Sequence, residues 1–165
     1  CMPTPVTDAF EFLRLVEPLV GTWAGTGHGD YPTIGAFDYR ETLQLAVRPA
    51  EETLRYEQRT LRLTAMGAVP SHWEVGLVWL TRDGELRLSN AQNGRSEAMS
   101  GRAVEEDGML VLELRSTVFG LDDRMVAAAR TIRLTGDVIE YEQRMATTSV
   151  TEETVHLRNR LTREA

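Results

Sequence analysis

Histidine is the side chain of this sequence with the clearest potential to hold a metal. The chain has three histidines, His28, His72 and His156, and they lie far apart in the sequence. A neutral imidazole is a common metal ligand, but a lone histidine is more often solvated or paired with a carboxylate. The single cysteine is Cys1, and no His-x-x-x-His or Cys-x-x-Cys spacing is present. A structural zinc site is therefore excluded.

Other reactive side chains are scarce or badly placed. All 18 basic residues are arginine, which excludes a lysine Schiff base and a phosphate-loop lysine. The acidic pairs at 105–106 and 122–123 lie at predicted turns, so we interpret them as solvated loop charges rather than paired catalytic carboxylates. No Gly-x-Ser-x-Gly elbow supports a Ser-His-Asp triad.

Glycines alternate with other residues between positions 21 and 34. Gly25, Gly27 and Gly29 leave one face of a strand without side chains, which allows another backbone, a helix or a flat ligand to approach closely. A phosphate loop is excluded because no Lys-Ser/Thr and no helix follow, and Pro32 stops helix propagation. A dinucleotide fingerprint fails because no βαβ unit surrounds these glycines.

The elements that must position these residues are mainly β-strands. A short amphipathic helix is predicted over 7–18, with Thr7 as its N-cap. Beyond it, period-two alternation and turn signals predict ten strands. They span 21–31, 35–47, 52–64, 71–81, 85–92, 95–104, 109–117, 125–134, 138–147 and 151–162. Short connections between the strands favour an all-β, antiparallel up-and-down barrel with an interior cavity. The helix is expected to cover one end of this barrel.

Two of these segments, 125–134 and 151–162, also have helical propensity. We prefer strands because in the second segment the alternation is clear. Val155, Leu157 and Leu161 share one face, whereas His156 falls on the opposite, polar face.

The same alternation orients three further side chains. Gln92 should point inward and needs a partner for its amide, and Met145 shares the face that lines the barrel. His72 shares its face with Glu74, so an ordinary ion pair is the alternative to a place in a pocket.

Composition and charge narrow the class of protein. With 165 residues and 42% hydrophobic content, we expect one domain over 1–165, whose barrel occupies 21–163. A net charge of −7 disfavours nucleic acid and anionic lipid as partners. No apolar run reaches membrane-spanning length and no signal pattern is present, so we expect a cytoplasmic protein. Cys1 precedes Met2, and we interpret it as a residue added for expression.

Several motifs resemble those of the nitrobindin family. The most specific is Gly21-x-Trp23-x-Gly25-x-Gly27-x-Gly29-x-Tyr31-Pro32-Thr33-Ile34. Further agreement lies in Pro70-Ser71-His72-Trp73-Glu74-Val75-Gly76, in Ala91-Gln92-Asn93-Gly94-Arg95-Ser96-Glu97, in Gly136-Asp137-Val138-Ile139-Glu140-Tyr141 and in His156-Leu157-x-x-x-Leu161-x-Arg163. The resemblance covers about residues 10–163.

This resemblance implies a ten-stranded barrel, shaped like fatty-acid-binding proteins, that holds one haem b in its ferric state. It implies isomerisation of peroxynitrite to nitrate and nitric oxide binding at the open axial position of the iron. His156 would be the proximal iron ligand and the residue on which catalysis depends. The resemblance also implies cofactor contacts on the distal side, in the pocket wall, beside the macrocycle and at a propionate. The distal contact would come from His72, and the wall contacts from Gln92 and Met145. The contacts beside the macrocycle would come from Gly25, Gly27, Gly29 and Thr33, and the propionate contact from Arg124.

One departure from the family pattern affects the pocket. Val78-Trp79-Leu80 stands where the family often has an arginine, which puts the polarity of the mouth in question. The barrel architecture also supports a second hypothesis, a non-catalytic carrier or sensor of a small apolar ligand, as in fatty-acid-binding proteins. A carrier needs no histidine at 156, and a carrier of anionic lipid needs arginines that point inward. A homodimer is also considered.

Overall fold

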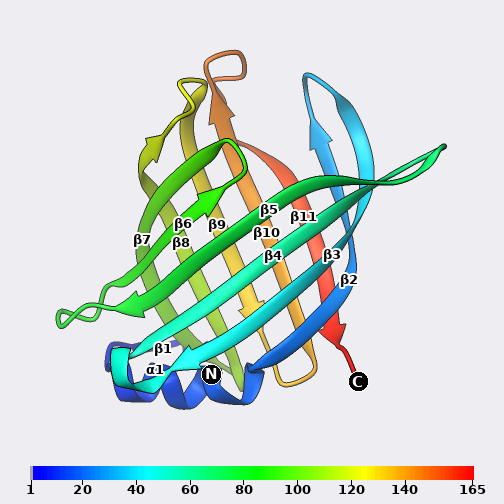
Figure 1. The fold of residues 1–165 in the computed structure, drawn as a ribbon. Helices are drawn as coiled ribbons and strands as arrows, with labels where there is room; N and C mark the ends of the chain where they lie inside the picture. The colour runs from blue at the N-terminus through cyan, green and yellow to red at the C-terminus, as the bar shows by residue number, and fades with distance from the viewer. Residues whose placement is uncertain (1) are drawn as a thin grey trace.

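Antiparallel strands occupy most of the chain beyond residue 20 in the computed structural model, which describes residues 2–165. They are β2 (Gly21–Tyr31), β3 (Gly35–Arg48), β4 (Thr53–Thr64), β5 (Gly67–Leu80), β6 (Leu86–Gln92), β7 (Arg95–Glu106), β8 (Met109–Gly120), β9 (Met125–Leu134), β10 (Val138–Thr147) and β11 (Thr154–Arg163). Each pairs with its neighbour in sequence, and β11 pairs with β2, which closes the barrel. The predicted ten-stranded up-and-down barrel is confirmed, and both ambiguous segments are strands (Figure 1).

The chain before the barrel forms three short elements. They are β1 (Thr4–Val6), α1 (Ala9–Val16) and the 3₁₀ turn η1 (Glu17–Leu19), and a second 3₁₀ turn, η2 (Pro49–Glu51), links β3 to β4. The sequence did not predict β1, which pairs with β7 beyond the end of β6. No helix within residues 2–165 is long and apolar enough to span a bilayer. Cys1 lies outside the described residues.

The helix α1 lies across one end of the barrel (Figure 1). Its N-cap is Asp8, whose carboxylate accepts a hydrogen bond from the Glu11 amide at 3.0 Å, so the predicted Thr7 cap is wrong by one residue. Phe12 and Val16 form the buried face at the i, i+4 spacing of a helix and join the apolar core at this end.

The alternating glycines of β2 make room for aromatic rings of the neighbouring strand. Gly27 is paired with Tyr39 and Gly29 with Phe37 across the β2–β3 ladder. A Cβ atom at either glycine would collide with the ring of its partner, and one at Gly25 would collide with the backbone carbonyl of Arg160. The glycines thus bring the rings of β3 against the inner face of β2.

Replacing Gly27 by alanine should lower the free energy of unfolding by about 1–3 kcal/mol, because the Tyr39 ring must move out of a packed position. Urea unfolding checks this value. Gly136→Ala is the matched control, since a Cβ there meets open space. Equal stabilities of the two variants would contradict the packing role of Gly27.

Candidate functional site

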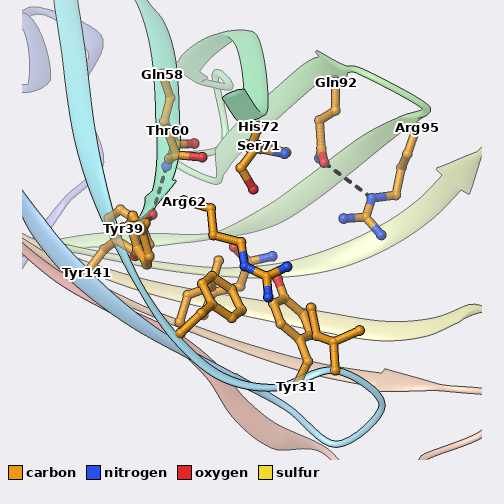
Figure 2. A pocket seen from close by; sticks show the side chains of 14 residues that line it. Tyr31, Tyr39, Gln58, Thr60, Arg62, Ser71, His72, Gln92, Arg95 and Tyr141 are labelled. Carbon is orange, nitrogen blue, oxygen red and sulfur yellow. Dashed lines mark hydrogen bonds between the residues drawn. The ribbon is translucent and has the colours of Figure 1, made fainter. Parts of the chain in front are cut away.

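A pocket of about 170 Å³ opens at the end of the barrel opposite α1. Figure 2 shows the side chains that line it. Aromatic and polar side chains line it, together with a few aliphatic ones, and none of the lining residues is acidic. They are Tyr31, Ile34, Phe37, Tyr39, Gln58, Thr60, Arg62, Ser71, His72, Gln92, Arg95, Tyr141, Gln143 and Leu157. The pocket is therefore built from β2 to β5, from the β6–β7 hairpin and from the C-terminal strands β10 and β11.

His156 lies at a β-bulge beside this pocket. The β10–β11 register shifts so that Gln143 pairs with Leu157 while Arg144 pairs with Val155, which leaves His156 as the extra residue. Because of this bulge, the His156 side chain does not point to the outer face of β11. It packs against Tyr31 instead, and only 3% of the residue is exposed. The polar-face position expected from simple alternation is therefore wrong.

The hydrogen bonding of His156 leaves one ring nitrogen free. Its Nδ1 lies 2.8 Å from the backbone carbonyl of Thr154, and a carbonyl oxygen can only accept, so Nδ1 carries the proton. In a neutral imidazole Nε2 is then the unprotonated nitrogen, and Nε2 has no hydrogen-bond partner among the described residues. An imidazole oriented by an Nδ1–H···O=C bond is the usual arrangement of a metal-ligating histidine.

Tyr31 covers His156 on the pocket side. Its ring lies 4.9 Å from the imidazole, centroid to centroid, and stacks in parallel on Phe37 at 5.5 Å. Tyr31 lines the pocket whereas His156 does not. Binding sites for organic ligands usually measure roughly 300–1,000 Å³. A flat macrocycle that reaches His156 must therefore displace the Tyr31 ring.

A buried ion-pair cluster lies inside the barrel next to the pocket. Arg130 donates to Glu74 at 2.6 and 3.1 Å and to Glu97 at 2.6 Å, and all three side chains are buried. His72 adds a contact to Glu74 at 3.2 Å. Burial opposes ionisation of Glu74, but the Arg130 charge and the His72 and Arg130 hydrogen bonds outweigh it and hold the pKa below its ordinary value. The motifs at 70–76 and 91–97, which contain Glu74 and Glu97, thus meet at Arg130. The sequence alone did not indicate a role for this arginine.

A second buried cluster surrounds Glu41, which forms no ion pair with any residue in 2–165. Gln58 donates to Oε1 at 2.8 Å, and Tyr141 donates to Oε2 at 3.0 Å, as does Asn159. Burial raises the pKa of Glu41 to about 7, although these hydrogen bonds act in the opposite direction. Glu41 is therefore the buried carboxyl whose protonation changes near neutral pH.

Protein stability should fall by about 3 kcal/mol between pH 5 and 8 because of Glu41. In the unfolded chain this carboxyl loses its proton near pH 4.5, whereas in the fold it keeps the proton to about 7, so the folded state binds more protons in this window. Glu41→Gln should remove that slope. The control Glu140→Gln, a partly exposed site, should retain it. Chemical denaturation across the pH range measures both, and a Glu41→Gln profile as steep as that of the unaltered protein would contradict the assignment.

Below the Glu41 cluster the barrel is apolar. A cavity of about 70 Å³ lies there, lined mainly by leucine, isoleucine and valine side chains. Gln58 and Tyr141 line both this cavity and the outer pocket. The polar clusters therefore divide the barrel interior into an outer polar part and an inner apolar part.

Some of the residues predicted for the site lie in the pocket and others do not. His72 and Gln92 line it, and Gln92 donates to Glu97 at 2.7 Å. Met145 is buried in the core, where its Sδ accepts from Gln143 at 3.3 Å. Thr33 is exposed in the turn between β2 and β3 and does not line the pocket.

The remaining predicted contacts lie behind the pocket wall or outside it. Gly25, Gly27 and Gly29 are on the inner face of β2, where the last two are covered by aromatic rings. Arg124 lies in the turn before β9 with its side chain 81% exposed, and it pairs with Asp122 at 3.0 Å. The structure does not bring Arg124 to the pocket.

Comparison with known proteins agrees with this geometry. The family described as "THAP4-like, heme-binding beta-barrel domain" matches residues 13–163. A peroxynitrite isomerase of Nocardia farcinica is 36% identical over 148 residues, covering 87% of this chain and 86% of that protein. Peroxynitrite isomerase 2 of Mycobacterium marinum is 34% identical over 142 residues, covering 84% and 86%. The crystal structure of Rv2717c from M. tuberculosis has a TM-score of 0.81 at 30% identity and covers 93% and 97% of the two chains.

Proposed function

Because the chain belongs to the THAP4-like haem-binding β-barrel family, we propose that it is a haem-dependent enzyme that isomerises peroxynitrite to nitrate. The observation that carries the proposal is the imidazole of His156, which is buried beside the pocket with Nε2 free. A single neutral histidine is a sufficient protein ligand for haem iron. The residues present therefore fit the cofactor.

We propose haem b, one per chain, in the ferric resting state. Covalent attachment as in c-type haem needs a Cys-x-x-Cys-His motif, and the chain has one cysteine. One buried histidine per barrel favours one haem per chain. When bound, the haem iron would supply Lewis-acid and redox chemistry toward peroxynitrite, and it would also bind nitric oxide.

The protein's own residues hold and orient the reactants. The Thr154 carbonyl accepts from Nδ1 of His156, which fixes the orientation of the imidazole and leaves Nε2 available to a ligand. Tyr39, Gln58 and Tyr141 separate the pocket from the apolar interior, and the strands around them confine a small anion near the cofactor. His72 and Gln92 supply polar contacts on the wall formed by β5 and β6.

The carrier hypothesis is not favoured by the cavities. The apolar cavity of about 70 Å³ and the outer pocket of about 170 Å³ are both below the roughly 300 Å³ of usual ligand pockets, so cavity volume does not favour an apolar ligand over haem. Inward arginines are present, as a carrier of an anionic lipid would need, but a porphyrin with its carboxylates needs them equally.

Rapid mixing of peroxynitrite with the haemin-loaded protein tests the proposed activity. The anion should decay faster than with the apoprotein, and the yield of nitrate over nitrite should rise with protein concentration. Free haemin at the same concentration is the control for unspecific chemistry. Decay no faster than with apoprotein, at full haem occupancy, would overturn the proposal.

A further inference from the structure

The outer pocket is cationic although the protein is acidic. The chain carries a net charge of −7, whereas the pocket lining contains two arginines and a histidine and no aspartate or glutamate. The long-range field of the protein therefore repels anions, and only a local concentration of positive charge can attract them to this opening.

Arg62 is the first of the two arginines, and both are half-buried. It lies on the inner face of β4, two residues beyond Thr60, which also lines the pocket. Its guanidinium lies over the Phe37 ring, 5.3 Å from the ring centroid, and this contact fixes its direction. Arg62 forms no ion pair with any acidic residue in 2–165. Its charge is thus not neutralised by the protein.

Arg95 lies across the pocket at the start of β7 (Figure 2). It donates to Gln92 at 3.3 Å and to Asp122 at 3.4 Å, and both bonds are long. The fork of five N–H donors therefore retains donors for a further acceptor. Arg130, in contrast, pairs with both Glu74 and Glu97 and does not line the outer pocket.

We propose that Arg62 and Arg95 form an anion-binding pair at the mouth of the pocket, which takes the carboxylates of a bound porphyrin or a free small oxyanion. A guanidinium matches the two oxygens of a carboxylate or an oxyanion with paired N–H donors. This inference deepens the proposed function, and it replaces Arg124, which is paired outside the pocket, as the partner of the propionates.

Fluorescence titration with iron-free protoporphyrin IX and with its dimethyl ester tests the pair without iron ligation. Arg62→Gln and Arg95→Gln should each weaken binding of the free acid about tenfold, and binding of the ester much less. Arg59→Gln is the matched control, since it removes the same charge from the outer face of β4, where Arg59 pairs with Glu57. Its affinities should equal those of the unaltered protein.

The second arm uses nitrate and the Arg62 Nε–H resonance in NMR spectra of the apoprotein. If the pair takes a free oxyanion, nitrate shifts this resonance with saturation, and Arg95→Gln weakens that response. A weaker affinity of the arginine variants for the free acid identifies the porphyrin carboxylates as the anion, whereas the nitrate response identifies a free oxyanion. Either result supports the pair. Equal porphyrin affinities together with no saturable nitrate shift would overturn it. Haemin titrated in parallel keeps the two proposals apart, because a missing His156-dependent Soret shift contradicts the proposed function alone.

Discussion

Arg130→Met is expected to lower the free energy of unfolding by about 3–5 kcal/mol. The substitution leaves the carboxylates of Glu74 and Glu97 buried without a cation, and their side chains are each 1% exposed. Removing one partner of a buried ion pair costs much more than the pair contributes, because the remaining charge has lost its water. Urea unfolding followed by circular dichroism measures the loss.

A matched variant and a compensated variant make this prediction specific. Arg133→Met changes an exposed arginine of the same strand, and its effect should stay within about 0.5 kcal/mol. The triple variant with Glu74→Gln and Glu97→Gln should recover most of the stability, because no buried charge remains. If Arg130→Met proved as mild as Arg133→Met, the cluster would not stabilise the barrel.

His156→Ala should weaken haemin binding by at least about a hundredfold. Loss of residues that only orient a metal ligand typically costs roughly 10- to 100-fold in affinity, so loss of the ligand itself should cost no less. The variant should still fold, because the imidazole makes hydrogen bonds to Thr154 alone and one ring contact, with Tyr31. A Soret titration gives the affinity, and a urea transition confirms folding.

Imidazole rescue separates ligation from packing at position 156. His156→Gly leaves space beside Tyr31, and added imidazole should restore the Soret band of the unaltered protein. His28→Ala is the control, because His28 is exposed and pairs with Asp38 at 2.9 Å. Haemin affinity unchanged in a folded His156→Ala protein would show that the iron is held elsewhere.

The fold was largely predictable because most strands alternate and four of the turns carry Asp-Gly, Asn-Gly or Gly-Asp signals. The N-terminal segment was harder to predict. Thr7 and Asp8 are both good N-cap residues, and only the hydrogen bond from Glu11 decides between them. The strand β1 has three residues and pairs with a strand about a hundred positions away, so no local pattern marks it.

The site was predictable in type but not in geometry. Residue motifs singled out His156, but strict alternation pointed its side chain outward, because a one-residue bulge leaves no signature in the sequence. The pairing of Arg130 with two distant glutamates depends on barrel closure. For Arg62 a signal was present, since it continues the inward series of Gln58 and Thr60.

The central claim is that Nε2 of His156 holds the iron, and resonance Raman spectroscopy tests it most directly. In the variant His28→Gln/His72→Gln, His156 is the one remaining histidine. The reduced, haemin-loaded variant should show a low-frequency iron–histidine band that shifts when histidine is labelled with ¹⁵N. A spectrum of the loaded variant without any label-sensitive band would contradict ligation by His156.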